Sequence, residues 1–427
     1  MKKTWQLDGL IVVSFLLPAV LVCQFLFLFN ASNTGEERAF TYEDSIPKIE
    51  INLNGVSIEE INSGEKTVKY SNNDLSLFYH NEASHYKNIE ISGHGNSTWT
   101  QRKKPYSLKF EERVDLLGIG KAKKWVLLAN FLDGTNIRND IVYYLGGMLG
   151  GDYKTRGEFV ELYIDNEYNG LYYLVQKIEI GKGLIDLRDP LGVLVELDNL
   201  HGLSESCYFA YDERCLLAKD LVKKDNLDLA MRDFLTSFNK LEIAAKNGDY
   251  ETVFEVADVE SLAKYYLVSE FTSNPDAYDT SWYFYKDGPL DKVHSDIYWD
   301  FDLALSNAAW GGSKFFLPDD IHTREKYVFG RDVYGREVEA DNATSKLMYF
   351  LIKIPEFREL VNQIFTKKMS GRSGELLDWA RSRSELIKEV RNKDAEFYEK
   401  GNPDLELDKL FEWAEKRYEH FEREYKS

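Results

Sequence analysis

The pattern of apolar residues changes along the chain, and this change constrains the fold more than any other feature. In the first half, segments such as IEINLN, LSLFYH and KNIEISGHG alternate apolar and polar residues, which is typical of antiparallel strands. From Asp225 onward, apolar residues recur at helical spacing, notably from Thr344 to Glu399, with breaks expected near Pro355 and Gly371, and from Leu405 to Lys426. The sequence therefore predicts an α+β protein with a strand-rich N-terminal lobe and a helix-rich C-terminal lobe.

The apolar run from Leu10 to Phe29 predicts a transmembrane helix, because about 20 helical residues cross the core of a bilayer. Lysines precede the run and glutamates follow it, so the positive-inside preference places the N-terminus in the cytoplasm. A cleaved signal peptide is the alternative, but the run is longer than the usual apolar region and Ala31-Ser32 is a poor cleavage site.

We therefore expect a single-pass protein of the cell membrane with an extracytoplasmic C-terminal domain. Residues 1–9 would be a cytoplasmic tail, residues 10–29 the transmembrane anchor in the membrane, and residues 30–46 an exposed linker. The folded domain would cover residues 47–427, with an N-lobe of about 47–185 and a C-lobe of about 186–427.

Composition argues for a folded domain and against a nucleic-acid partner. Of the 427 residues, 44% are hydrophobic and 14% aromatic, enough for a large core. The formal net charge is −19, and the main basic cluster is the isolated run Arg102-Lys103-Lys104, which we expect to be exposed. A chain with this charge is a poor match for a phosphate backbone, so we expect no nucleic acid.

Two acidic segments lie close together between Tyr265 and Asn307. The first, NPDAYDTS, contains Asp276 and Asp279, and the second, WDFD, contains Asp300 and Asp302. A strand from Trp282, a turn at residues 286–289 and a returning strand would bring Asp276 and Asp300 to one end of a hairpin. Two carboxylates there suit a general base and a ligand of a divalent cation.

A glycine-rich segment, Gly93-His94-Gly95-Asn96-Ser97-Thr98, precedes a strand that contains Lys104 and Lys109. Glycine lets backbone N–H groups approach an anion, and Ser97 and Thr98 add hydroxyl donors, so the segment is a candidate phosphate site. It matches neither a Walker loop nor a dinucleotide fingerprint, and an ordinary tight turn is the commoner explanation.

Other polar residues are weaker candidates for the same cleft. Arg138 opens an expected helix from Asn136 to Leu149 and can pair with a cleft carboxylate or serve a structural ion pair. EFVELYIDNEYNGLYYLVQ predicts a hairpin with its turn at Asn169-Gly170, which ends at Gln176. The strand GVLVELDN ends in acids, with Glu196 near its end.

Cys207 and Cys215 are eight positions apart, and the sequence leaves their state open. An extracytoplasmic location permits a local disulfide, and two free thiols are the equal alternative.

Five segments in this order resemble the CotH family of spore-coat and secreted protein kinases. They are GHGNSTWTQRKKPYSLKF, KWVLLANFLDGTNIRND, VELYIDNEYNGLYYL, SEFTSNPDAYDTSWYFYKD and YWDFDLAL. The resemblance implies an atypical protein-kinase-like two-lobe fold that uses ATP with Mg²⁺ or Mn²⁺ and phosphorylates serine on extracytoplasmic proteins.

The resemblance also assigns residues. Asp276 matches the catalytic aspartate, Asp300 matches the metal aspartate, and Asp302 is a second ligand or holds a backbone turn. The segment from Gly93 to Thr98 corresponds to the loop that covers phosphate.

Lys104 and Lys109 fall on the strand where a kinase places its phosphate lysine. We favour Lys109, because it lies deeper in the strand and strand alternation prevents both lysines from facing one cleft.

Two positions depart from the family. Many relatives carry Asn about five residues after the catalytic aspartate, where this chain has Thr280, Ser281 and Trp282, so the metal site has one amide oxygen fewer. Gln176 stands where many relatives have Glu.

Three functions compete. The first is a membrane-anchored, ATP- and metal-dependent kinase that modifies serine or threonine hydroxyls of surface or secreted proteins. The second is a catalytically inactive module of the same fold that binds a surface partner. A metal-dependent hydrolase ranks last, because the histidine ligands common in such sites are missing from the acidic segments.

Overall fold

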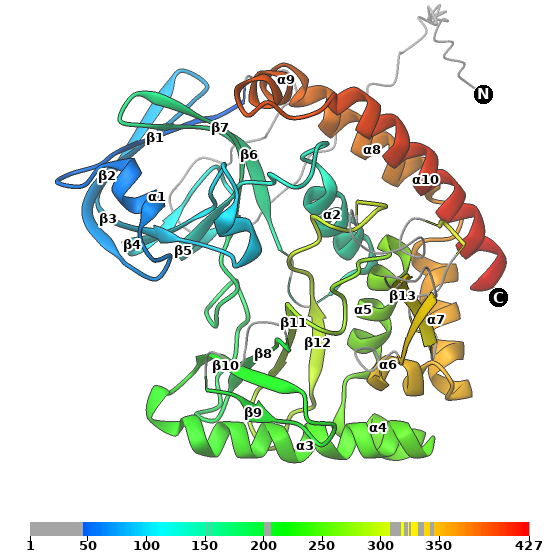
Figure 1. The fold of residues 1–427 in the computed structure, drawn as a ribbon. Coiled ribbons are helices and arrows are strands. Elements are labelled where there is room, and N and C mark those ends of the chain that lie inside the picture. The colour runs from blue at the N-terminus through cyan, green and yellow to red at the C-terminus, as the bar shows by residue number, and fades with distance from the viewer. Residues whose placement is uncertain are drawn as a thin grey trace, which may run out of the picture. The chain divides into compact units, whose positions relative to one another are not determined.

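We describe the protein from a computed structural model, which covers residues 46–151, 153, 155–199, 206–307, 317–319, 323, 326–331, 337–341 and 346–426. The strands of the first half close into a seven-stranded barrel with the order β1-β2-β3-β4-β5-β7-β6 (Figure 1). The strands are β1 (Lys48–Asn52), β2 (Tyr70–Tyr79), β3 (Glu82–Gly93), β4 (Tyr106–Asp115), β5 (Lys121–Leu128), β6 (Gly157–Ile164) and β7 (Glu167–Gln176).

Closure of the barrel depends on β1. Its alternating sequence KIEIN buries Ile49 and Ile51 completely. One edge of β1 pairs with β2 in antiparallel fashion, and the other pairs with β6 in parallel, with Ile49 opposite Leu162. Both edges are therefore hydrogen-bonded, and the barrel leaves no free edge at this strand.

The hairpin of β6 and β7 is confirmed, but its predicted turn at Asn169-Gly170 is wrong. The chain turns at Asp165 and Asn166, which both have positive φ (49° and 69°), as a two-residue hairpin turn requires. Gly170 lies inside β7, where an added Cβ would come within 2.5 Å of Asp394 Oδ1. Gly170 therefore leaves the room that this close contact needs, and it has no part in the turn.

A second sheet has the antiparallel order β12-β11-β8-β10-β9. Its strands are β8 (Val193–Leu197), β9 (Tyr208–Phe209), β10 (Cys215–Leu221), β11 (Trp282–Lys286) and β12 (His294–Ile297), and β13 (Lys326–Arg331) pairs separately with β14 (Glu337–Asp341). The long helix α3 (Leu227–Asn247) lies across this sheet and buries Phe234 and Phe238 (Figure 1).

The remaining helices follow the predicted periodicity. They are α1 (Ile58–Ser63), α2 (Arg138–Leu149), α4 (Tyr250–Val256), α5 (Val259–Thr272), α6 (Lys346–Leu351), α7 (Pro355–Lys368), α8 (Ser373–Leu386), α9 (Lys388–Phe397) and α10 (Pro403–Glu424). As expected, Pro355 begins a new helix and Gly371 lies in the break before the next one.

Two buried ion-pair networks join the barrel to the C-terminal helices. Lys103 Nζ lies 2.7 Å from Asp394 Oδ1 of α9, and both side chains are completely buried. Arg383 of α8 bonds Asp140 of α2 at 2.7 Å and Glu158 of β6 at 2.6 Å. The expectation that the basic run is exposed is thus wrong for Lys103, because its partner lies far along the chain.

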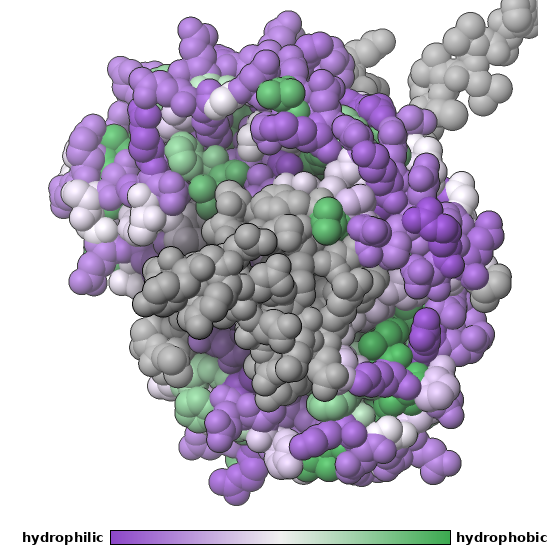
Figure 2. All heavy atoms as spheres, turned by 45° about the vertical axis from the view of Figure 1, so that its right-hand side comes forward, coloured by the Kyte–Doolittle hydropathy of each residue, from purple (hydrophilic) through white to green (hydrophobic). Residues whose placement is uncertain are grey.

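Hydrophobic residues fill one continuous interior that both sheets and the helices share. On the face in Figure 2, hydrophilic side chains predominate and hydrophobic ones form only small groups. Tyrosine and tryptophan form much of the interior around α5, where the rings of Tyr265 and Trp282 stack with centroids 5.1 Å apart.

These findings show that the predicted two-lobe, kinase-like fold is wrong. The strand-rich half is a closed barrel, and residues 45–427 form one compact unit. Alternation of apolar residues identifies strands, but it does not determine whether the first strand pairs with a later one and closes the sheet.

The predicted membrane topology is also corrected. Within the described residues, none of the helices has the length and apolar character needed to cross a membrane. The proposed anchor, residues 10–29, lies outside the described residues, so the expected single-pass membrane localisation has no support in the structure.

Candidate active site

Asp276 lies in the loop between α5 and β11, and the packing of α5 determines where this loop begins. Arg417 of α10 is buried and donates to the carbonyl of Phe271 at 3.1 Å and also to the carbonyl of Glu270. It thereby satisfies carbonyl groups of the last turn of α5. Ser273 then takes a left-handed conformation (φ 49°) and redirects the chain into the Asp276 loop.

Asp300 and Asp302 follow β12, at the end of the β11–β12 hairpin where β11 begins. Tyr283 pairs with Ile297 across this hairpin, so the segments before β11 and after β12 meet at one end, as predicted. Asn274, beside Asp276, donates to the carbonyl of Asp300 at 3.4 Å. The hairpin thus brings the two acidic segments together.

The backbone at Asp300 is strained, with φ at +66°. Two contacts hold it: Ser281 Oγ donates to Asp300 Oδ2 at 3.1 Å, and Asn139 of α2 accepts a bond from the N–H of Phe301 at 2.8 Å. Ser281 is one of the three residues found where the family resemblance predicts an Asn, and it bonds Asp300 directly.

The carboxylates act on one another electrostatically. Burial, followed by the charges of Asp300, Asp279 and Asp198, raises the pKa of Asp276 to about 7. Burial is also the main cause that raises the pKa of Asp302, followed by the charge of Asp300. Among the described residues, no group of three or more His, Cys, Asp or Glu side chains is placed to hold a metal ion.

Arg138 serves a structural ion pair, which was one of its two predicted roles. It is buried and pairs with Asp133, whose other oxygen accepts the N–H of Arg138 at 2.9 Å. Its Nε donates to the carbonyl of Ala304 at 3.0 Å. Arg138 therefore connects the start of α2 to the residues that follow Asp302, and it helps to hold the acidic segment in position.

The glycine-rich segment lies at the end of β3 and continues into the short 3₁₀ helix Ser97–Thr100. Gly95 has φ +71°, and an added Cβ would collide with Thr98 Oγ1. Lys66 Nζ donates to the carbonyl of Gly95 at 2.9 Å, so a cation already lies against the segment. His94 packs edge-on against Trp299, the residue before Asp300, with ring centroids 6.2 Å apart.

The polar contacts of Lys104 and Lys109 are with residues of the barrel and its loops. Lys104 Nζ donates to the carbonyls of Trp99 at 2.6 Å and Gln101 at 3.3 Å, within its own loop. The side chain of Lys109 is 43% exposed and its Nζ lies 3.8 Å from Glu90 on the neighbouring strand.

Gln176 also serves the barrel. It is buried at the end of β7, and its amide donates to the carbonyl of Gly120 at 2.8 Å. The bond holds the β4–β5 turn against the end of β7. This role requires a hydrogen-bond donor, which the Gln176 amide supplies, and it requires no charge.

Glu196 pairs with a lysine that the sequence did not single out. Its carboxylate lies 2.7 Å from Lys219 Nζ of β10, and it is opposite Tyr283 of β11, whose hydroxyl also hydrogen-bonds it. Burial raises the pKa of Glu196 and the charge of Lys219 lowers it. No sequence motif identifies Lys219, because only the pairing of β10 with β8 brings it beside Glu196.

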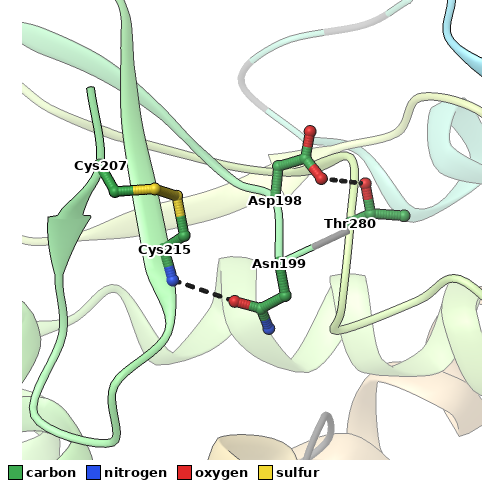
Figure 3. The surroundings of a disulfide bond; sticks show 5 residues. All are labelled: Asp198, Asn199, Cys207, Cys215 and Thr280. Atoms are coloured by element: carbon green, nitrogen blue, oxygen red, sulfur yellow. Dashed lines mark hydrogen bonds between the residues drawn. A yellow bond between two sulfur atoms is a disulfide. The ribbon is translucent and has the colours of Figure 1, made fainter. Parts of the chain in front are cut away.

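The two cysteines form a disulfide next to the Asp276 loop (Figure 3). The N–H of Cys215 donates to Asn199 Oδ1 at 2.9 Å, and Thr280 donates to Asp198 Oδ1 at 2.9 Å. Asp198 and Asn199 directly follow β8, so the disulfide-closed hairpin and the Asp276 loop share one anchor.

A pocket of about 600 Å³ lies toward the opposite end of the β11–β12 hairpin. Its lining includes Tyr285 and His294, whose rings stack with centroids 4.7 Å apart, together with residues 184–188. The acidic residues Asp276, Asp300 and Asp302 do not line it.

Comparison with known proteins agrees with the resemblance in the five segments. The model of the family described as CotH kinase protein matches residues 91–421, which is most of the chain. No curated protein matches the sequence. The matched range includes the glycine-rich segment, the acidic hairpin and the C-terminal helices. The chain therefore belongs to the CotH kinase protein family.

Proposed function

We propose that the protein is a kinase that transfers the γ-phosphoryl group of ATP to serine or threonine hydroxyls of a protein substrate, with Mg²⁺ or Mn²⁺ as cofactor. The observation that carries the proposal is the meeting of the Asp276 loop and the Asp300 segment at one end of the β11–β12 hairpin. Family membership supports kinase chemistry at this place.

Asp276 suits the role of general base. The residue is half-buried, and its loop is fixed at both ends by α5 and β11. A base with a pKa near the working pH takes a proton from an incoming hydroxyl most effectively. Burial and neighbouring carboxylates raise the pKa of Asp276 in this direction, to about 7.

Asp300 and Asp302 have the right chemistry for a divalent cation. Mg²⁺ in kinases is held by one or two carboxylates, with substrate phosphates and waters as the other ligands. Two carboxylates from one segment therefore suffice, and a cage of three protein ligands is not needed. When bound, the cation would neutralise charge on the phosphates.

Asn139, Ser281 and Arg138 would keep the acidic segment in place during the reaction. Asn139 and Ser281 bond the backbone and side chain around Asp300, and Arg138 bonds the chain beyond Asp302. Such fixed groups need little rearrangement when charge develops.

The test is transfer of label from γ-labelled ATP by the full-length protein, to itself or to casein, with Mg²⁺ or Mn²⁺. We expect transfer that stops with a chelator and in Asp300→Asn. The matched control is Asp408→Asn, which changes an exposed acid on α10 and should leave transfer unchanged. Nucleotide binding without transfer by the unaltered protein would instead indicate a catalytically inactive binding module.

A further inference from the structure

We propose that the hydroxyl group of Tyr143 holds a water ligand of the divalent cation that binds at Asp300 and Asp302. Tyr143 belongs to α2 and lies outside the five segments that carry the family resemblance. The inference rests on the proposed kinase function and adds a positioning residue to its metal site. Its basis is a buried hydroxyl without a partner on the helix face that contacts the acidic segment.

The first observation is the state of this hydroxyl. Tyr143 is 6% exposed, and its hydroxyl oxygen has no hydrogen-bond partner among the described residues. A buried polar group without a partner is unfavourable, because folding removes it from water and returns no bond. Such a group in a native structure requires an explanation, and a bound water or ion supplies the missing bond.

The second observation is the way α2 lies against the chain that leaves β12. Asn139 Oδ1 accepts the N–H of Phe301 at 2.8 Å, and a Cβ added at Gly146 would collide with the ring of Tyr298. Asn139 and Gly146 are seven residues apart, a rise of about 10 Å along a helix, and the three residues from Tyr298 to Phe301 span about the same length when extended. This segment therefore runs along one face of α2.

Tyr143 is on the same face of α2. It follows Asn139 by four residues and precedes Gly146 by three, so the three residues share one side of the helix. Helical side chains lean toward the N-terminal end of their helix, which here is the end that contacts Phe301. The ring of Tyr173 of β7 is also close, with centroids 6.1 Å apart. Tyr143 therefore lies between the barrel and the acidic segment.

The charges of the acidic segment support this placement. Burial, then the charges of Asp300, Tyr153 and Asp302, raise the pKa of Tyr143, so the hydroxyl keeps its proton at neutral pH. The hydroxyl nevertheless bonds neither carboxylate. A group that faces two carboxylates and bonds neither is suited to an intervening water molecule.

The chemistry of the cation identifies that water. Mg²⁺ bound by one or two carboxylates keeps several water ligands, and such a water needs an acceptor for its protons. The neutral phenol oxygen of Tyr143 is an acceptor. Contacts of this kind orient the ligands of a metal ion and increase the affinity of the site.

The experiment measures Mn²⁺ binding to the full-length protein at saturating ATP, from the EPR signal of free Mn²⁺. Tyr143→Phe removes only the hydroxyl and should weaken Mn²⁺ binding by about 10-fold or more. Tyr266→Phe is the matched control, because it also removes a buried hydroxyl, but one that is bonded to Tyr425 at 3.0 Å. Its Mn²⁺ affinity should equal that of the unaltered protein.

Urea unfolding of the metal-free proteins separates a role toward the cation from a structural role. Tyr143→Phe should unfold at the same urea concentration as the unaltered protein or at a higher one, because no bond within the protein is lost. Tyr266→Phe should unfold at a lower concentration, because its bond to Tyr425 is lost. A lower midpoint for Tyr143→Phe, or an unchanged Mn²⁺ affinity in this variant, would overturn the assignment.

Asp300→Asn distinguishes failure of this inference from failure of the proposed function. Mn²⁺ binding that Asp300→Asn abolishes and Tyr143→Phe leaves unchanged would exclude Tyr143 and leave the kinase function standing. Mn²⁺ binding that depends on both residues, in a protein that transfers no label, would support the role of Tyr143 and contradict the kinase function. An unaltered protein that binds no Mn²⁺ at saturating ATP would overturn both.

Discussion

The side-chain amide of Asn199 donates to Asp279 Oδ1 at 2.8 Å, and its backbone N–H donates to the carbonyl of Asp279 at 2.9 Å. Its side-chain oxygen accepts the N–H of Cys215. Asn199 thus bonds the Asp276 loop on one side and the disulfide-closed hairpin on the other, and the position of the candidate base depends on a residue outside its loop.

Asn199→Ala should lower the rate of label transfer and destabilise the fold by about 1 to 3 kcal/mol, because it removes the side-chain bonds to the Cys215 N–H and the Asp279 carboxylate and leaves only the backbone bond to Asp279. Urea unfolding and the transfer assay measure the two effects. Asn226→Ala is the control, because Asn226 also donates to a backbone carbonyl, that of Pro190, but outside this loop. Equal transfer rates in the two variants would contradict a role for Asn199 in placing the loop.

Replacing both cysteines by serine should lower the free energy of unfolding. The disulfide closes a loop with a sequence separation of 8, and the chain-entropy model gives about 2 to 3 kcal/mol for a loop of this size. The backbone N–H of Cys215 bonds Asn199, and a hairpin without its disulfide holds this donor less firmly. The double variant should therefore lose transfer activity at temperatures where it is still folded. If reductant and the double substitution both left transfer activity unchanged, the disulfide would have no role in positioning the site.

Asp198→Asn should shift the acid limb of the pH–rate profile to lower pH. The base must be deprotonated to act, so the rate rises as pH passes the pKa of Asp276, which is about 7. Asp198 is among the charges that raise this pKa, so its neutralisation lowers the pKa and extends activity to lower pH. Asparagine keeps an oxygen that can accept the Thr280 hydroxyl bond. A purely structural effect would reduce the rate at every pH without moving the midpoint.

Asp394→Asn should destabilise the protein by about 3 to 5 kcal/mol, because it removes the counter-charge of a completely buried lysine, Lys103. Thermal and denaturant unfolding measure the loss. Glu415→Gln removes the exposed pair with Arg381 instead and should change stability little. Similar stability of the two variants would show that the buried pair does not hold the barrel to α9.

Local sequence signals predicted the parts of the fold that local physics determines. The aromatic strand from Trp282, its returning partner and the acids at their shared end follow from alternation and turn residues. The helix breaks near Pro355 and Gly371 follow from backbone chemistry.

Features that depend on distant pairing could not be predicted in this way. The parallel pairing of β1 with β6 closes the barrel, and no pattern in β1 identifies that partner. In the sequence, Lys103 is typical of a solvated charge, and only the folded position of α9 places Asp394 beside it. The hairpin turn was placed at Asn169-Gly170 because Asn-Gly is a strong turn signal, but Asp165-Asn166 accepts the same left-handed conformation.

The most direct test of the proposed chemistry compares the unaltered protein with Asp276→Asn at saturating ATP and Mg²⁺, measuring both ATP affinity and a single turnover of label transfer. Asparagine keeps the size of the side chain but cannot accept a proton as the carboxylate does. We predict ATP affinity at least equal to that of the unaltered protein and loss of transfer by about 100-fold or more, the range of general-base catalysis. Transfer at an unchanged rate in Asp276→Asn would contradict the account.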